Sequence, residues 1–145
     1  MPIALQDLGR AVKQLQYRHH RGMDSKLREV GTSLAQWDAL RAIATRPNSS
    51  GHALAEMTFQ TDQSFGALAN RLVKRGMIQR VAGPGRAIRH RLTPSGEATL
   101  RKGHELAGQV LESSFAPLTS RQREDFYRLL SRALVEGNPA QRVGL

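Results

Sequence analysis

Polar and basic side chains gather between residues 61 and 75, and their spacing predicts one outward face of an amphipathic helix. If the apolar residues of this segment pack inward, the outer face consists of Gln63, Ser64, Gly66, Ala67, Asn70, Arg71 and Lys74. Gln, Ser and Asn side chains can hydrogen-bond to base edges, while Arg and Lys neutralise phosphates. Because any surface helix exposes polar residues, this pattern alone also fits a helix with no ligand.

A second basic cluster follows directly and consists of Arg80, Arg86, Arg89 and Arg91. The strand-like runs Met77–Val81 and Ala87–Leu92 flank a segment rich in turn formers, which predicts a β-hairpin with a basic tip. An arginine at such a tip can enter a narrow minor groove, where the negative potential is deepest. The alternative interpretation is a solvated strand face.

Composition favours a polyanionic partner. The 145 residues include 22 Lys and Arg against 12 Asp and Glu, which gives a formal net charge of +10. Nucleic acid is the leading candidate for a partner of such a chain. The chain contains no cysteine, which excludes disulfides, thiolate metal sites, cysteine nucleophiles and regulation by thiol oxidation.

Other site chemistry finds little support in the sequence. The five histidines show no helix-spaced pairing with carboxylates that would form a ligand set, so we predict no metal site; they are His19, His20, His52, His90 and His104. His90 alternates with Ile88 and Leu92 on one strand face and is expected to be partly buried and hydrogen-bonded. No nucleophile motif, phosphate loop or acid pair is present, so we predict neither an enzyme nor a cofactor.

No apolar run approaches the roughly 20 residues that span a bilayer, and residues 1–10 lack the order of a signal peptide. We therefore expect a cytoplasmic protein without a membrane partner.

The elements that position the two basic clusters follow from apolar periodicity and end signals. A long first helix runs from Leu5 towards Gly31, and a second begins after Ser33 and stops before Pro47. A short third helix covers residues 54–57, with Phe59 expected in the core beside it. The fourth helix has Thr61 as its N-cap and ends at Gly76.

Two further helices follow the hairpin. Thr93 and Pro94 open the fifth, which runs towards Phe115. Thr119 and Gln122 have the spacing of a capping box at the start of the sixth, which ends at Gly137. The predicted fold is therefore mainly α with a small β-hairpin wing, in the order that is typical of a winged helix-turn-helix, whose second helix reads the major groove.

Three blocks of sequence are characteristic of one protein family. They are Leu34-Ala35-Gln36-Trp37-Asp38-Ala39-Leu40, the helix Leu68–Arg75 with Gly76-Met77-Ile78-Gln79-Arg80, and Arg86-Ala87 leading to Leu92-Thr93-Pro94-Ser95-Gly96. In these blocks and their spacing, the chain resembles the MarR family of bacterial transcriptional regulators over about residues 5–136.

The resemblance implies one MarR-like domain over residues 1–145. Residues 33–93 would form the winged-helix DNA-binding region, 5–30 and 94–136 the flanking dimerisation helices, and 137–145 a loose tail. The apolar stripes of the first, fifth and sixth helices exceed what the small core could cover in one protomer, which also indicates a homodimer. A two-fold dimer would bind a pseudo-palindromic double-stranded DNA operator.

The resemblance also implies residue roles. Arg86 would be the wing arginine at the minor groove, with Arg89 beside it, and Gln63 and Ser64 with their neighbours would read the major groove. Two positions depart from the family pattern: Pro84 replaces the Asp usually found two residues before the wing arginine, and Ala67 replaces a basic or polar residue.

The implied function is a transcriptional regulator, expected to be a repressor relieved by a small aromatic ligand. Tyr17, His20 and Trp37 are the candidate pocket residues, with core or dimer packing as the alternative role of Trp37. Two other functions stay open, namely a winged-helix protein-interaction module and a non-specific architectural DNA binder.

Overall fold

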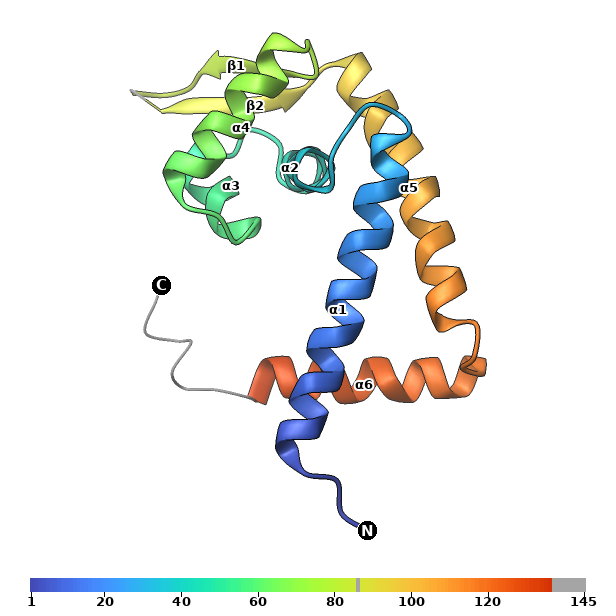
Figure 1. Cartoon of the computed structure of the whole chain (residues 1–145). Helices are drawn as coiled ribbons and strands as arrows, with labels where there is room; N and C mark the ends of the chain where they lie inside the picture. Colours follow the sequence, from blue (N-terminus) through green and yellow to red (C-terminus); the bar gives the residue numbers. More distant parts are fainter. Residues whose placement is uncertain (86, 137–145) are drawn as a thin grey trace. The chain divides into compact units, whose positions relative to one another are not determined.

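The computed structural model describes residues 1–85 and 87–136 of the chain (Figure 1). The chain packs as two compact units, Met1–Val110 and a second that begins at Leu111. The predicted wing-tip residue Arg86 and the predicted loose tail 137–145 lie outside the described residues. Elsewhere the predicted order of helices and hairpin is confirmed.

Side-chain capping explains where three helices of the first unit begin. Helix α1 (Leu5–Arg28) is followed by Gly31, which has a positive φ of 79° that suits glycine. In helices α2 (Leu34–Thr45), α3 (Gly51–Met57) and α4 (Asp62–Lys74), the N-cap hydroxyl accepts a backbone N–H three residues on. The caps are Ser33, Ser50 and Thr61, each satisfying a helix N–H that has no intrahelical partner.

The wing is an antiparallel hairpin of β1 (Ile78–Ala82) and β2 (Ile88–Leu92), in which Ile78 pairs with Leu92 and Arg80 with His90. The loop between α2 and α3 runs beside β2. Asn48 N–H donates to the His90 carbonyl at 3.1 Å, and His90 N–H donates to the Ser49 carbonyl at 3.3 Å. The hairpin is therefore fixed to the helical body along one edge.

The winged-helix core lies where α2, α3, α4 and β1 meet. Its largest fully buried side chains include Leu40, Ile43, Leu54, Phe65, Leu72 and Ile78. The inward face predicted for α4, which also contains Leu68 and Ala69, is confirmed.

The prediction for Phe59 is wrong, because its side chain is 97% exposed. Phe59 adopts a positive φ of 56° in the turn after α3, where Gln60 N–H donates to the Ala55 carbonyl at 2.9 Å. A left-handed residue that closes a helix in this way turns its Cβ away from the helix, here towards solvent.

Helix α5 (Pro94–Phe115) lies side by side with α1 (Figure 1). Its start approaches the wing so closely that a Cβ on Gly96 would lie 2.0 Å from the Met77 carbonyl oxygen. Further along, Gly103 leaves room for the Trp37 ring. A second hydrophobic cluster forms there from Leu27, Leu34, Trp37 and Ala107.

In the second unit, α6 (Ser120–Glu136) opens with the predicted capping box. Thr119 and Gln122 exchange hydrogen bonds of 2.9 and 3.2 Å between side chain and backbone. The predicted apolar stripe is largely open to solvent within the single chain: Leu129 is 62% and Leu134 is 82% exposed. Among the helices of the described residues, none combines the length and apolarity needed to span a membrane.

Candidate nucleic-acid interface

The outer face of α4 presents the side chains that the sequence predicts. Gln63, Ser64, Ala67, Asn70, Arg71 and Lys74 are all exposed, and Gly66 is half-buried. Asp62 in the first turn and Arg71 and Lys74 in the last turn complement the helix dipole. The face therefore offers hydrogen-bonding groups along its length and cations towards its C-terminal end.

Arg80 joins the wing to this face. Its guanidinium donates a hydrogen bond to the Asn70 side-chain oxygen at 2.7 Å, which places a β1 cation beside a predicted base-reading residue. Among the described residues, none accepts a hydrogen bond from the Asn70 amide nitrogen, so its donors can face a ligand. The sequence placed Arg80 in the basic cluster, but only the folded chain pairs it with Asn70.

His90 lies beneath this junction and is only 4% exposed. Its Nδ1 lies 3.1 Å from the Ser49 carbonyl oxygen, and its ring meets Phe65 edge-on with centroids 6.1 Å apart. Burial lowers the pKa of His90, as does nearby Arg80, and the hydrogen bond to Ser49 opposes them. The predicted buried and hydrogen-bonded histidine is confirmed, and its neutral ring donates to the carbonyl from Nδ1.

The other two described arginines of the hairpin hold the wing to the body. Arg89 donates to the Asn48 carbonyl at 3.0 Å, and Arg91 donates to the Asn48 side-chain oxygen. Asn48 has a positive φ of 67°. Arg89, predicted to contact DNA, is half-buried and has this internal partner as well.

A hollow of about 420 Å³ lies between α3, α4 and the hairpin. It is lined by Ser50, Gly51, Asp62, Phe65, Gly66, Ala69, Arg80, Ile88 and His90. The hollow is open to solvent, and it combines aromatic and aliphatic walls with the Arg80 cation and the Asp62 carboxylate.

The three residues predicted for an effector pocket have different surroundings. Trp37 is buried, donates from Nε1 to the Leu100 carbonyl at 3.2 Å, and lies under the Arg41 guanidinium, 5.4 Å from the ring centroid. Tyr17 is 58% exposed and His20 is exposed, both on α1. In the single chain, Trp37 is thus part of the core, while Tyr17 and His20 are surface residues.

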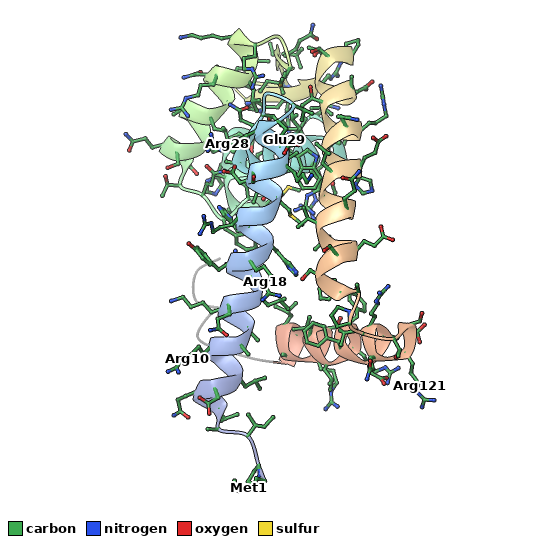
Figure 2. All side chains as sticks on the ribbon, turned by 45° about the vertical axis from the view of Figure 1, so that its right-hand side comes forward. Met1, Arg10, Arg18, Arg28, Glu29 and Arg121 are labelled. Carbon is green, nitrogen blue, oxygen red and sulfur yellow. The ribbon has the colours of Figure 1, made fainter. Side chains whose placement is uncertain are left out.

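Basic side chains continue along α1. Figure 2 shows Arg10, Arg18 and Arg28 at successive levels of the helix. Arg28 also pairs with Asp24 through a contact of 2.8 Å.

Two polar contacts at the ends of α4 were not predicted. At its start, Asp62 lies 3.0 Å from His52 Nδ1, while Glu56 lies 3.1 Å from His52 Nε2. The hydrogen bond and charge of Asp62, with those of Glu56, raise the pKa of His52. At its end, Arg75 donates to the Gly31 carbonyl and to the Gln36 side-chain oxygen. The Arg75 contacts span 44 and 39 residues, so no local signal could have indicated them. His52 and Glu56, by contrast, are four residues apart on α3, a local spacing that the sequence shows.

These features define a winged helix-turn-helix protein, with α3 and α4 as the helix-turn-helix and β1–β2 as the wing. A family model described as the MarR family matches residues 30–87, which confirms the resemblance predicted from the sequence. No curated protein shows significant sequence similarity to the chain.

Solved structures share the fold over most of the chain. A probable transcriptional regulator from Pseudomonas aeruginosa is 29% identical, with a TM-score of 0.76 over 89% of this chain and 98% of that one. A cysteine-to-serine mutant of MarR from E. coli, complexed with operator DNA, has a TM-score of 0.80 at 22% identity, covering 88% and 94%. A Mycobacterium tuberculosis MarR family protein, complexed with p-aminosalicylic acid, has a TM-score of 0.74 at 23% identity, covering 86% and 96%.

Proposed function

We propose that this chain is a sequence-specific double-stranded DNA-binding transcriptional regulator that acts as a homodimer. The observation that carries the proposal is the exposed polar face of α4, joined to the wing by the Arg80–Asn70 hydrogen bond, in a chain of net charge +10. A similar fold has been solved with operator DNA bound.

In this proposal, α4 enters the major groove. Gln63, Ser64 and Asn70 contact base edges, and Arg71 and Lys74 contact phosphates. Ala67 contributes a methyl group suited to apolar contact with thymine. Arg86 supplies the minor-groove contact from the wing, while Arg89 stabilises the wing from behind through Asn48.

Dimerisation uses apolar side chains that the single chain leaves exposed. On α1 these include Leu5, Leu8 and Val12, and on α6 they include Tyr127, Leu129, Leu134 and Val135. Apolar surface of this extent on two helices favours association over exposure to water. The dimer gives two copies of α4 and hence a two-fold symmetric site for inverted half-sites.

The proposal includes repression that is relieved by a small aromatic ligand. A protein of this fold has been solved with p-aminosalicylic acid bound. The hollow beside α4 combines apolar walls with the Arg80 cation and the Asp62 carboxylate, which suits a small aromatic ligand with polar substituents. A ligand that binds Arg80 would compete with Asn70 for its guanidinium. Tyr17 and His20 on α1 are a second candidate ligand surface, completed by the partner protomer.

Titration of a fluorescent duplex with purified protein, at salt between about 50 and about 200 mM, tests DNA binding, because phosphate contacts make affinity fall steeply with salt. The proposal predicts salt-dependent binding that survives an excess of genomic competitor DNA. If the genomic competitor displaces the fluorescent duplex completely, the protein is a non-specific architectural binder instead. No duplex binding at any salt would favour a protein-interaction module.

A further inference from the structure

The residue that ends α4 contacts the junction between α1 and α2. Arg75 is the C-cap residue of α4 and donates one N–H group to the Gly31 carbonyl and another to Gln36 Oε1, the latter at 2.7 Å. Thr32 Oγ1 donates to the same Gln36 oxygen at 3.1 Å. One planar guanidinium therefore joins the end of α4 to the turn after α1, 44 residues away, and to α2, 39 residues away.

The acceptor side of this contact is itself fixed. Gly31 has a positive φ of 79°, and the turn that contains it is closed by Thr32 N–H, which donates to the Leu27 carbonyl at 3.1 Å. From α1, the Asp24 carboxylate accepts the Leu34 N–H at 3.0 Å and so caps the start of α2. The junction between α1 and α2 is thus hydrogen-bonded from α1 on one side and from α4 on the other.

Apolar packing alone does not fix how the two groups of buried residues are oriented relative to each other. The winged-helix core and the cluster around Leu27 and Trp37 are two separate groups of buried residues, and Leu100 is partly buried against both. Apolar contact is not directional, so it sets the separation of the two groups better than their relative orientation. A guanidinium that donates two hydrogen bonds in its own plane fixes orientation.

We infer that Arg75 is a positioning residue that fixes the orientation of α4 relative to α1. This inference rests on the proposed function, in which α1 belongs to the dimerisation region and α4 reads DNA. Arg75 would then set the separation of the two recognition helices and hence the half-site spacing that the dimer accepts. The residue acts through geometry and need not touch DNA.

The first test measures orientation within one chain and needs neither DNA nor a dimer. The absence of native cysteine allows spin labels at Lys13→Cys on α1 and Ala67→Cys on α4, both exposed positions. Dilution with unlabelled protein isolates the distance within one chain, which pulsed electron paramagnetic resonance measures. We expect a narrow distance distribution for the parent chain and a broadened or shifted one for Arg75→Ala.

Two further variants separate geometry from charge. Gln36→Leu removes one acceptor and keeps the Arg75 charge, so it is expected to broaden the distribution as well, whereas Gln36→Glu retains an acceptor and keeps it narrow. Arg71→Ala removes the same charge from the outer face of α4 and serves as the matched control, with no change in distance. Unchanged distributions in both Arg75→Ala and Gln36→Leu would overturn the inference.

The second test measures affinity for operators whose half-site spacing is altered by one base pair. We expect the parent to prefer the original spacing, and Arg75→Ala to reduce that preference by at least about threefold, the size of a modest coupling between contacts. Arg71→Ala weakens binding to all spacings equally. If the parent binds no duplex, the proposed function fails, while the distance measurement still decides the role of Arg75. If Arg75→Ala binds DNA with an undiminished preference for the original half-site spacing, the proposed role of Arg75 is contradicted.

Discussion

At the scale of single residues, His52 links the short helix α3 to the start of α4. Its two ring nitrogens face the carboxylates of Glu56 and Asp62, at 3.1 and 3.0 Å. Asp62 is the larger cause of the raised pKa of His52, and Glu56 adds to it. His52 therefore binds its proton more strongly in the folded chain than in the unfolded chain.

The sign of the pH dependence follows from that shift. The stabilisation from His52 is complete below the ordinary pKa of 6.5 and is lost as pH rises through the raised pKa. We predict that His52→Gln lowers the urea midpoint of unfolding at about pH 5.5 and has little effect at about pH 8.5. Taking the difference from the parent removes the opposite contribution of His90, whose pKa is lowered. His104→Gln, an exposed change on α5, is the control, and an equal loss at both pH values would contradict the prediction.

The surroundings of Gly103 predict how an alanine at this position would change the stability of the fold. A Cβ at this position would lie 2.3 Å from Trp37 Cδ1, whereas one on Gly108 of the same helix meets nothing within 4 Å. Gly103→Ala is expected to destabilise the fold by about 1–3 kcal/mol through overpacking. Gly108→Ala is expected to stabilise it by about 0.5–1 kcal/mol, because alanine is the better helix former. Chemical denaturation of both variants checks the pair, and equal effects would show that Trp37 has room to move.

Arg86 is the single wing residue to which the proposed function assigns a minor-groove contact. Arg86→Ala is expected to weaken operator binding by about 1–3 kcal/mol, the usual size of a specific contact. The matched control is Arg101→Ala on α5, which removes the same charge outside the proposed interface. Unchanged affinity of Arg86→Ala over several salt concentrations would show that the wing, with Pro84 at its turn, does not reach the groove.

At the scale of elements, the recognition helix α4 divides into base-reading and phosphate-binding residues. Gln63→Ala and Asn70→Ala are expected to change base preference, because their side chains hydrogen-bond with base edges. Lys74→Ala is expected to weaken binding to all sequences and to reduce the salt slope by about one unit for each phosphate that the variant no longer neutralises. Titrations of the three variants against one panel of duplexes separate the classes. Unaltered base preference in both Gln63→Ala and Asn70→Ala would mean that another face of α4 reads the DNA.

Helix boundaries and the inward face of α4 could be predicted because they depend on neighbouring residues. Caps such as Ser33 and Thr61 act over three residues, and the apolar period of α4 repeats every three or four. Phe59 could not be placed, since its apolar side chain indicates burial while the backbone turn after α3 directs it to solvent. Hydropathy carries no information on that turn.

The same limit applies to the site. The sequence identified the polar face of α4 and the basic hairpin, but the pairings of Arg80 with Asn70 and of Arg75 with Gln36 depend on how elements pack. The sequence does not distinguish the roles of the four arginines in the hairpin. In the structure, Arg89 and Arg91 hold the α2–α3 loop, while Arg80 faces α4.

At the scale of the whole molecule, the proposed dimer connects exposed apolar side chains to the symmetry of the operator. Two copies of α4 related by a two-fold axis would meet successive turns of the major groove on one side of the duplex. The positive net charge of each protomer adds non-specific attraction, and the α4 side chains add sequence preference.

Selection of binding sites from a random duplex library, with the purified full chain, tests sequence-specific recognition by a dimer most directly. We expect enrichment of a pseudo-palindrome whose two inverted half-sites are centred about one helical turn apart, roughly 34–36 Å. A single asymmetric site, or no enrichment over the starting library, would contradict recognition by a dimer.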